Sequence, residues 1–149
     1  MSKQAKLVIV GSGIVGCSAA YHLTQLGWRD IVVVDKGHPI ENDGSTSHAP
    51  GGLVGLSHSK LLTLMAQYTS NLVAGLEPYT AEQHTYNPVG GLEVAISERR
   101  WQDLIRLHGE AVGFGAEAHL LTPAEAKAKM PYLNEEAFVG PCSCPRAPL

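Results

Sequence analysis

Three glycines near the start of the chain constrain its fold more than any other feature. Gly11, Gly13 and Gly16 form a GxGxxG array within VIVGSGIVG, directly after the short β-branched run KLVIV at residues 6–10. Such a run, ending at glycine, predicts a buried strand, and the apolar spacing over residues 14–26 predicts a helix. A strand, a glycine turn and a helix in this order predict an α/β fold with a parallel sheet.

Each glycine has a different task in such a turn. Gly11 allows the tight turn, Gly13 lets the backbone approach a pyrophosphate, and Gly16 lets the helix pack closely on the strand. The free N–H groups and the positive dipole end of the helix favour a phosphate. Asp35 closes a second buried strand, IVVVD, where a carboxylate can accept hydrogen bonds from both ribose hydroxyls of an adenosine. We therefore predict an adenine dinucleotide. The acid disfavours NADP, and the glycines leave NAD and FAD open.

Hydrophobic spacing predicts three more helices and further strands in the rest of the chain. GGLEVAIS at residues 90–97 is typical of a strand, EAFVG at 136–140 is a weaker strand candidate, and PCSCPRAPL has no periodicity. The first predicted helix covers 61–76, with Ser57 or Ser59 as N-cap and Pro78 beyond its end. The second is capped by Ser97, and its predicted buried face consists of Trp101, Leu104, Ile105, His108 and Val112. The third begins with a capping box formed by Thr122 and Glu125, has Pro123 at its first position, and ends before Pro131.

Composition excludes several classes of protein. The chain of 149 residues is 44% hydrophobic and 17% charged with a net charge of −3, which is typical of a globular protein and excludes nucleic acid as a partner. No apolar run approaches the roughly 20 residues that span a bilayer, so we expect no membrane segment and a cytoplasmic location. The three cysteines have neither zinc nor thioredoxin spacing, so we expect no metal site.

The loop GSTSHAPGG, residues 44–52, is the part of the sequence that best indicates a class of function. Alone, its histidine His48 would be interpreted as an ordinary solvated or backbone-bonded loop residue. With VIVGSGIVG, VVVDKG, VGGLEVAIS and LLTPAEAKAKMPYL, the loop resembles the FAD-dependent amine oxidoreductases of the D-amino-acid-oxidase superfamily, specifically the sarcosine and dimethylglycine dehydrogenase and dimethylglycine oxidase group. The resemblance runs over about residues 6–140, and the histidine loop is its most specific part.

The resemblance implies a cofactor, a reaction and partners. In that group the histidine matching His48 is joined through a ring nitrogen to the 8α-methyl carbon of FAD, and Ser45 and Thr46 match positions that contact the flavin. The implied reaction is oxidation of N-methylated glycines, sarcosine or dimethylglycine, by hydride transfer to the flavin, with tetrahydrofolate as a further partner. The cofactor-binding residues that we expect are Gly11, Gly13, Ile14, Val15, Gly16, Asp35, Lys36, Ser45, Thr46 and His48.

The resemblance also implies a longer protein, because members of the group run to several hundred residues. We expect residues 1–80 to be the N-terminal part of a Rossmann-type FAD-binding domain, 81–140 to begin an α+β substrate domain, and 141–149 to be an irregular tail that we interpret as an out-of-frame end. Catalytic residues would follow Leu149, so the isolated chain would be inactive. Two alternatives remain: a truncated, non-catalytic dinucleotide-binding fragment, or a relative of D-amino-acid or glycine oxidases, against which the loop histidine argues.

Overall fold

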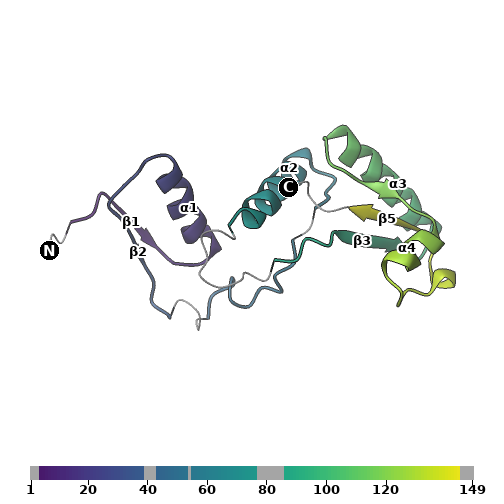
Figure 1. Ribbon diagram of the computed structural model, residues 1–149, viewed down its shortest axis with the longest axis horizontal. Helices are drawn as coiled ribbons and strands as arrows, with labels where there is room; N and C mark the ends of the chain where they lie inside the picture. The colour runs from purple at the N-terminus through teal and green to yellow at the C-terminus, as the bar shows by residue number, and fades with distance from the viewer. Residues whose placement is uncertain (1–3, 39–42, 54, 77–85, 145–149) are drawn as a thin grey trace. The chain divides into compact units, whose positions relative to one another are not determined.

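The computed structural model describes residues 4–38, 43–53, 55–76 and 86–144. These residues belong to two compact units, Met1–Gly52 and Leu53–Leu149, and each unit is described by itself (Figure 1). The helix over residues 60–74, which we expect in a FAD domain ending at residue 80, falls within the second unit. The domain bounds of the protein therefore stay a prediction.

The first unit is the strand, helix and strand that the glycine pattern predicts. Strand β1 (Leu7–Val10) pairs in parallel with β2 (Ile31–Val34), and α1 (Ile14–Gln25) connects them. Gly27, at φ 86°, turns the chain just after the helix in a conformation that other residues rarely adopt. The parallel sheet and the α/β fold class are confirmed.

Apolar side chains of this first unit remain largely exposed. Helix α1 buries no residue completely, and Val10, at the end of β1, is 85% exposed. Val8, Val32 and Val34 project from the same side of the sheet as Val10, and they are 53%, 44% and 42% exposed. The apolar faces of the helix and the strands are therefore only partly covered within the described residues of this unit.

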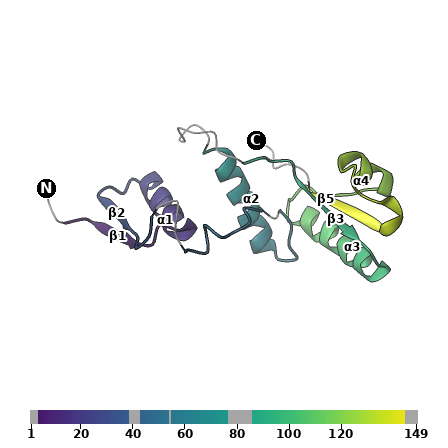
Figure 2. The same ribbon diagram turned by 90° about the horizontal axis from the view of Figure 1, so that it is seen from below.

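The second unit contains an antiparallel sheet in the order β3-β5-β4. Its strands are β3 (Gly91–Ala95), β4 (His119–Leu120) and β5 (Gly140–Cys144). Helix α3 (Glu98–Gly113) lies along this sheet (Figure 2). The core forms where this helix meets the two longer strands, and its buried residues are Ala95, Leu104, Leu107 and Cys142.

The buried face of α3 differs in part from the predicted one. Leu104 is fully buried and Trp101 is partly buried, as expected, but Val112 is 52% exposed. Leu107 and Ala111, which the predicted face omitted, are buried instead. The face is rotated because Leu107 packs in the cluster beside the sheet, whereas Ala111 packs with Ala116 and Ala118, which follow the helix.

The end of the chain holds the main correction. The weak strand expected at 136–140 is wrong in place: Glu135–Ala137 form the 3-10 helix η2, and the strand runs from Gly140 to Cys144. Residues 141–144, expected to be irregular, thus form the central strand of the sheet. This segment is extended because it pairs with β3 and β4 on its two sides. Its first residue, Gly140, packs against the Trp101 ring, where an added Cβ would lie only 2.6 Å from the ring. Residues 145–149, and the out-of-frame interpretation of them, lie outside the described part of the chain.

The two remaining helices begin where their capping residues predict. Helix α2 (Lys60–Ala74) is capped by Ser59, whose hydroxyl accepts from the amide of Leu62; Pro78 lies outside the described residues. Helix α4 (Pro123–Lys129) has the predicted capping box, in which Thr122 and Glu125 each accept the other's backbone N–H. Within the ranges that the structure describes, no helix has the length and apolar character needed to cross a bilayer.

Leu104→Ala should destabilise the second unit. Leu104 is fully buried, so its loss leaves a cavity, and we expect the free energy of unfolding to fall by about 2–5 kcal/mol. Leu61→Ala is the matched control, because Leu61 is 66% exposed and should change the free energy by only about 0.5 kcal/mol. Urea unfolding followed by tryptophan fluorescence measures both, and equal losses would contradict this view of the core.

Candidate cofactor site

The glycine turn is shaped by backbone contacts that exclude side chains. Gly11 has φ 107°, and its N–H donates to the carbonyl of Val34 at 2.7 Å, which ties the turn to the end of β2. A Cβ on Gly16 would lie 1.9 Å from the carbonyl oxygen of Gly11. The first turn of α1 can therefore sit directly beyond β1 only with glycine at this position, which is the packing role predicted for it.

The loop that follows β2 reaches back to the start of α1. Gly13 is the N-cap of α1 and offers no side-chain cap, but the hydroxyl of Thr46 accepts the N–H of Ile14 at 2.9 Å. A Cβ on Gly13 would lie 3.1 Å from that hydroxyl oxygen. Thr46 thus supplies, from a distant loop, the cap that a glycine cannot, and it brings the two predicted cofactor-binding segments together.

Asp35 stands at the carboxyl end of β2 and is held by three hydrogen bonds. One carboxylate oxygen, Oδ2, accepts from the N–H and the hydroxyl of Ser12 at 2.6 and 3.0 Å, and Oδ1 accepts from the N–H of Gly37 at 2.8 Å. These bonds, led by the amides of Ser12 and Gly37, lower the pKa of Asp35. The side chain is therefore an ionised acceptor at neutral pH, which suits ribose hydroxyls and repels a 2′-phosphate.

His48 is oriented by its own loop. Its Nδ1 lies 3.0 Å from the carbonyl oxygen of Gly44, and the hydroxyl of Ser47 donates to that same oxygen at 2.8 Å. The Ser47 hydroxyl also lies 3.3 Å from Nδ1. Since a carbonyl can only accept, the Gly44 contact favours the tautomer that has its proton on Nδ1 and its lone pair on Nε2. The small residues around it leave the ring exposed.

A groove with a volume of about 1210 Å³ joins these segments at the carboxyl ends of the two strands. Of the predicted residues, Ile14, Val15 and Gly16 lie outside its lining, because Gly16 acts in packing and the first two begin the helix. The groove is lined by Val10, Gly11, Gly13, Val34, Asp35, Lys36, Gly37, Asp43, Gly44, Ser45, Thr46 and His48.

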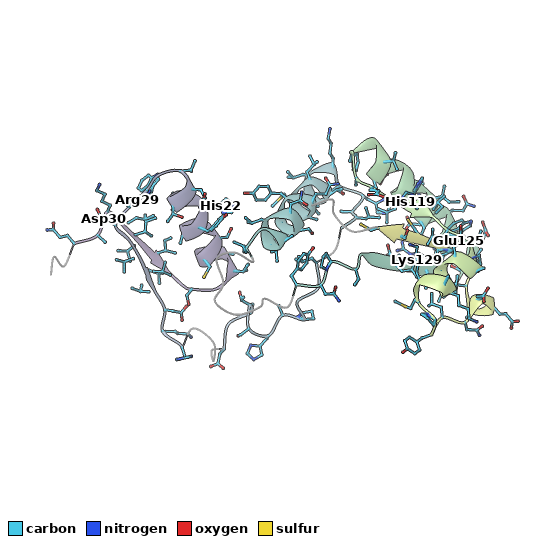
Figure 3. The ribbon with its side chains drawn as sticks, viewed as in Figure 1. His22, Arg29, Asp30, His119, Glu125 and Lys129 are labelled. Carbon is cyan, nitrogen blue, oxygen red and sulfur yellow. The ribbon has the colours of Figure 1, made fainter. Side chains whose placement is uncertain are left out.

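The sequence analysis missed Ser12, the second residue of the glycine array. A hydroxyl in the motif, followed by an acid at the end of the next strand, is the signal that could have identified it. Other polar side chains lie elsewhere: His22, Arg29 and Asp30 gather toward the opposite, amino ends of the strands (Figure 3). Among the residues described, no group of three or more His, Cys, Asp or Glu side chains is arranged to hold a metal ion.

Comparison with known proteins identifies relatives along nearly the whole chain. The family described as FAD dependent oxidoreductase (DAO) matches residues 6–147. The mitochondrial pyruvate dehydrogenase phosphatase regulatory subunit of Mus musculus is 34% identical over 92% of the chain. Human mitochondrial sarcosine dehydrogenase and dimethylglycine dehydrogenase are 31% and 32% identical over 91% and 88% of it. The chain spans about 15% of the length of each of these relatives.

Solved structures share the fold. L-proline dehydrogenase from P. horikoshii superimposes with a TM-score of 0.85 at 20% identity, over 98% of this chain and 38% of that one. Glycine oxidase from Geobacillus kaustophilus gives a TM-score of 0.75 at 26% identity, over 94% of this chain and 39% of that one.

Gly16→Ala should weaken dinucleotide binding. The added methyl group would lie 1.9 Å from the Gly11 oxygen, so the helix start must move away from the turn that it completes. We expect at least about a tenfold loss of FAD affinity, measured by quenching of flavin fluorescence. Gly52→Ala is the control, because its added Cβ would meet nothing within 4 Å. Unchanged affinity in Gly16→Ala would show that this close approach does not shape the site.

Proposed function

The chain belongs to the family of FAD-dependent oxidoreductases, and from this membership we propose that it is the N-terminal part of an enzyme that oxidises N-methylated glycines. The observation that carries the proposal is the exposed His48 in the groove, on a loop that resembles the flavin-linking loop of the sarcosine and dimethylglycine enzymes. Identities of 31% and 32% to two dehydrogenases named for these amines support the same substrate class.

The described residues fit the adenosine and pyrophosphate parts of FAD. Gly11 and Gly13 leave the backbone bare beside the start of α1, where the amide of Val15 and the helix dipole would favour phosphate oxygens. The Ile14 amide is already held by the hydroxyl of Thr46. Asp35 would accept the ribose hydroxyls, with Lys36 beside it. When bound, FAD supplies the redox chemistry by accepting a hydride from the carbon next to the amine nitrogen.

The histidine loop would hold the flavin end. We propose that His48 would be joined covalently to the 8α-methyl carbon of FAD, with Nε2 as the bonding nitrogen because the Gly44 carbonyl holds the proton on Nδ1. The methyl carbon would lose one hydrogen as a proton and the imidazole would lose its own, while the electron pair of the broken C–H bond would reduce the flavin. Ser45 and Thr46 would contact the cofactor from the same turn, and Thr46 already reaches the start of α1. The groups that bind the substrate would lie in a region outside these 149 residues. Tetrahydrofolate, as the further partner, would bind there too.

A second candidate is a non-catalytic dinucleotide-binding protein. The 34% identity to a protein named as a regulatory subunit favours it, because that name describes a regulatory role. An amino-acid oxidase is a third candidate, supported by the 26% identity to glycine oxidase. The cytoplasmic location stays a prediction, and the three curated relatives named above are mitochondrial proteins.

The purified protein, in its natural length, should be yellow and bind FAD rather than NAD. Anaerobic sarcosine or dimethylglycine should bleach the flavin absorption, because the proposed substrates reduce it. Glycine is the control substrate: bleaching by glycine alone would instead support an oxidase of amino acids. A flavin that none of these amines reduces would support the non-catalytic candidate, and a colourless protein that binds only NAD would overturn the cofactor.

If His48 forms the covalent bond, acid-precipitated protein should stay yellow, since a carbon–nitrogen bond survives unfolding. His48→Ala should release the flavin into the supernatant, while its intact glycine turn and Asp35 still bind FAD reversibly. His22→Ala, a histidine at the other end of the first unit, should stay yellow. Mass spectrometry and NMR of the flavin peptide should locate the bond on Nε2 of His48. A flavin adduct on another peptide, or none at all, removes this role.

A further inference from the structure

Ser12 occupies a variable place in the glycine array, yet its polar atoms converge on one carboxylate oxygen. Its N–H and its hydroxyl both donate to Oδ2 of Asp35, at 2.6 and 3.0 Å. These two bonds join the turn after β1 to the end of β2, residues that are 23 positions apart. A side chain placed only for turn formation would not need a bond to the acid.

Ser12 is itself fixed, so its contact with the acid has a defined direction. Its carbonyl accepts the thiol of Cys17, one turn into α1, at 3.0 Å. On the other side of the carboxylate, the N–H of Gly37 donates to Oδ1 at 2.8 Å. Asp35 is therefore held from both sides and cannot rotate without losing a hydrogen bond.

This arrangement leaves the two carboxylate oxygens unequal. Each can accept about two hydrogen bonds, and Ser12 alone supplies two donors to Oδ2. Oδ1 accepts from the Gly37 amide at 2.8 Å, and Asp35 is part of the groove lining. A ribose hydroxyl that enters the groove thus meets an acceptor whose orientation is already set.

We propose that Ser12 is a positioning residue that presets Asp35 as the acceptor for a nucleoside with free ribose hydroxyls. The inference rests on the proposed binding of an adenine dinucleotide. It adds Ser12 as a residue that, by orienting Asp35, favours ligands whose ribose hydroxyls are free. Removing the Ser12 hydroxyl would take away one of the bonds that orient Asp35, while the N–H groups of Ser12 and Gly37 keep theirs. Ligand binding would then weaken only where the ligand has hydroxyls to donate.

The test uses flavin-free protein of natural length, prepared from riboflavin-starved cells, and titrates ADP and 2′,3′-dideoxy-ADP by calorimetry. Ser12→Ala should weaken ADP binding about 3- to 10-fold, the effect of one hydrogen bond, and change dideoxy-ADP binding by less than about twofold. Ser12→Thr keeps the hydroxyl and should restore ADP affinity. Ser18→Ala is the control, because Ser18 lies on α1 and its hydroxyl contacts His22.

Two further measurements separate positioning from a general structural loss. In an Asp35→Asn background, Ser12→Ala should have little additional effect, because the oriented charge is already gone. The loss of ADP affinity on acidification should occur at higher pH in Ser12→Ala. Its hydroxyl helps to lower the pKa of Asp35, so without it the carboxylate takes up its proton sooner as the pH falls.

The outcomes distinguish this inference from the proposed function. Equal losses for ADP and dideoxy-ADP, or an undiminished effect of Ser12→Ala in the Asp35→Asn background, would overturn the positioning role. A wild-type protein that binds neither ADP nor FAD would instead overturn the dinucleotide site on which the inference rests. Selective loss of ADP affinity, restored by threonine, is the result that we expect.

Discussion

The backbone contact between Gly16 and the carbonyl of Gly11 sets the geometry on which the candidate site depends. Because no Cβ separates them, the first turn of α1 lies directly beyond the end of β1. That placement points the free amides of the helix at the same edge of the sheet where β2 ends, and Gly11 reinforces it by donating to Val34. A larger residue at position 16 would separate the two ends and remove the groove.

Parallel pairing then explains why residues far apart in sequence share one site. The carboxyl ends of parallel strands lie at the same edge, so Asp35 at the end of β2 comes beside Ser12 after β1. The next loop is drawn to the same edge by Thr46, which caps α1, and it carries His48 with it. The start of a helix, an ionised acid and an exposed imidazole therefore lie around one groove within one small unit.

Local signals predicted the parts of the fold that depend on backbone conformation. The glycine turn, the capping box at Thr122 and the cap at Ser59 follow from residues that bond within a few positions of themselves. Strand β5 could not be predicted in this way, because Pro-Cys-Ser-Cys is extended through its pairing with two distant strands. In the same way, the partners of Ser12 became visible only once the parallel register placed Asp35 beside it.

The exposure of the first unit connects folding to the cofactor. Helix α1 completely buries no side chain, and the apolar side chains of β1 and β2 are partly exposed among the residues described. A ligand that binds only the folded unit adds its own binding free energy, about 2.7 kcal/mol at one hundred times its dissociation constant. If FAD binds in the groove as proposed, it would also stabilise the turn that forms the groove. The bonds between Ser12 and Asp35 would help, because a site that is already ordered costs the ligand less free energy to bind.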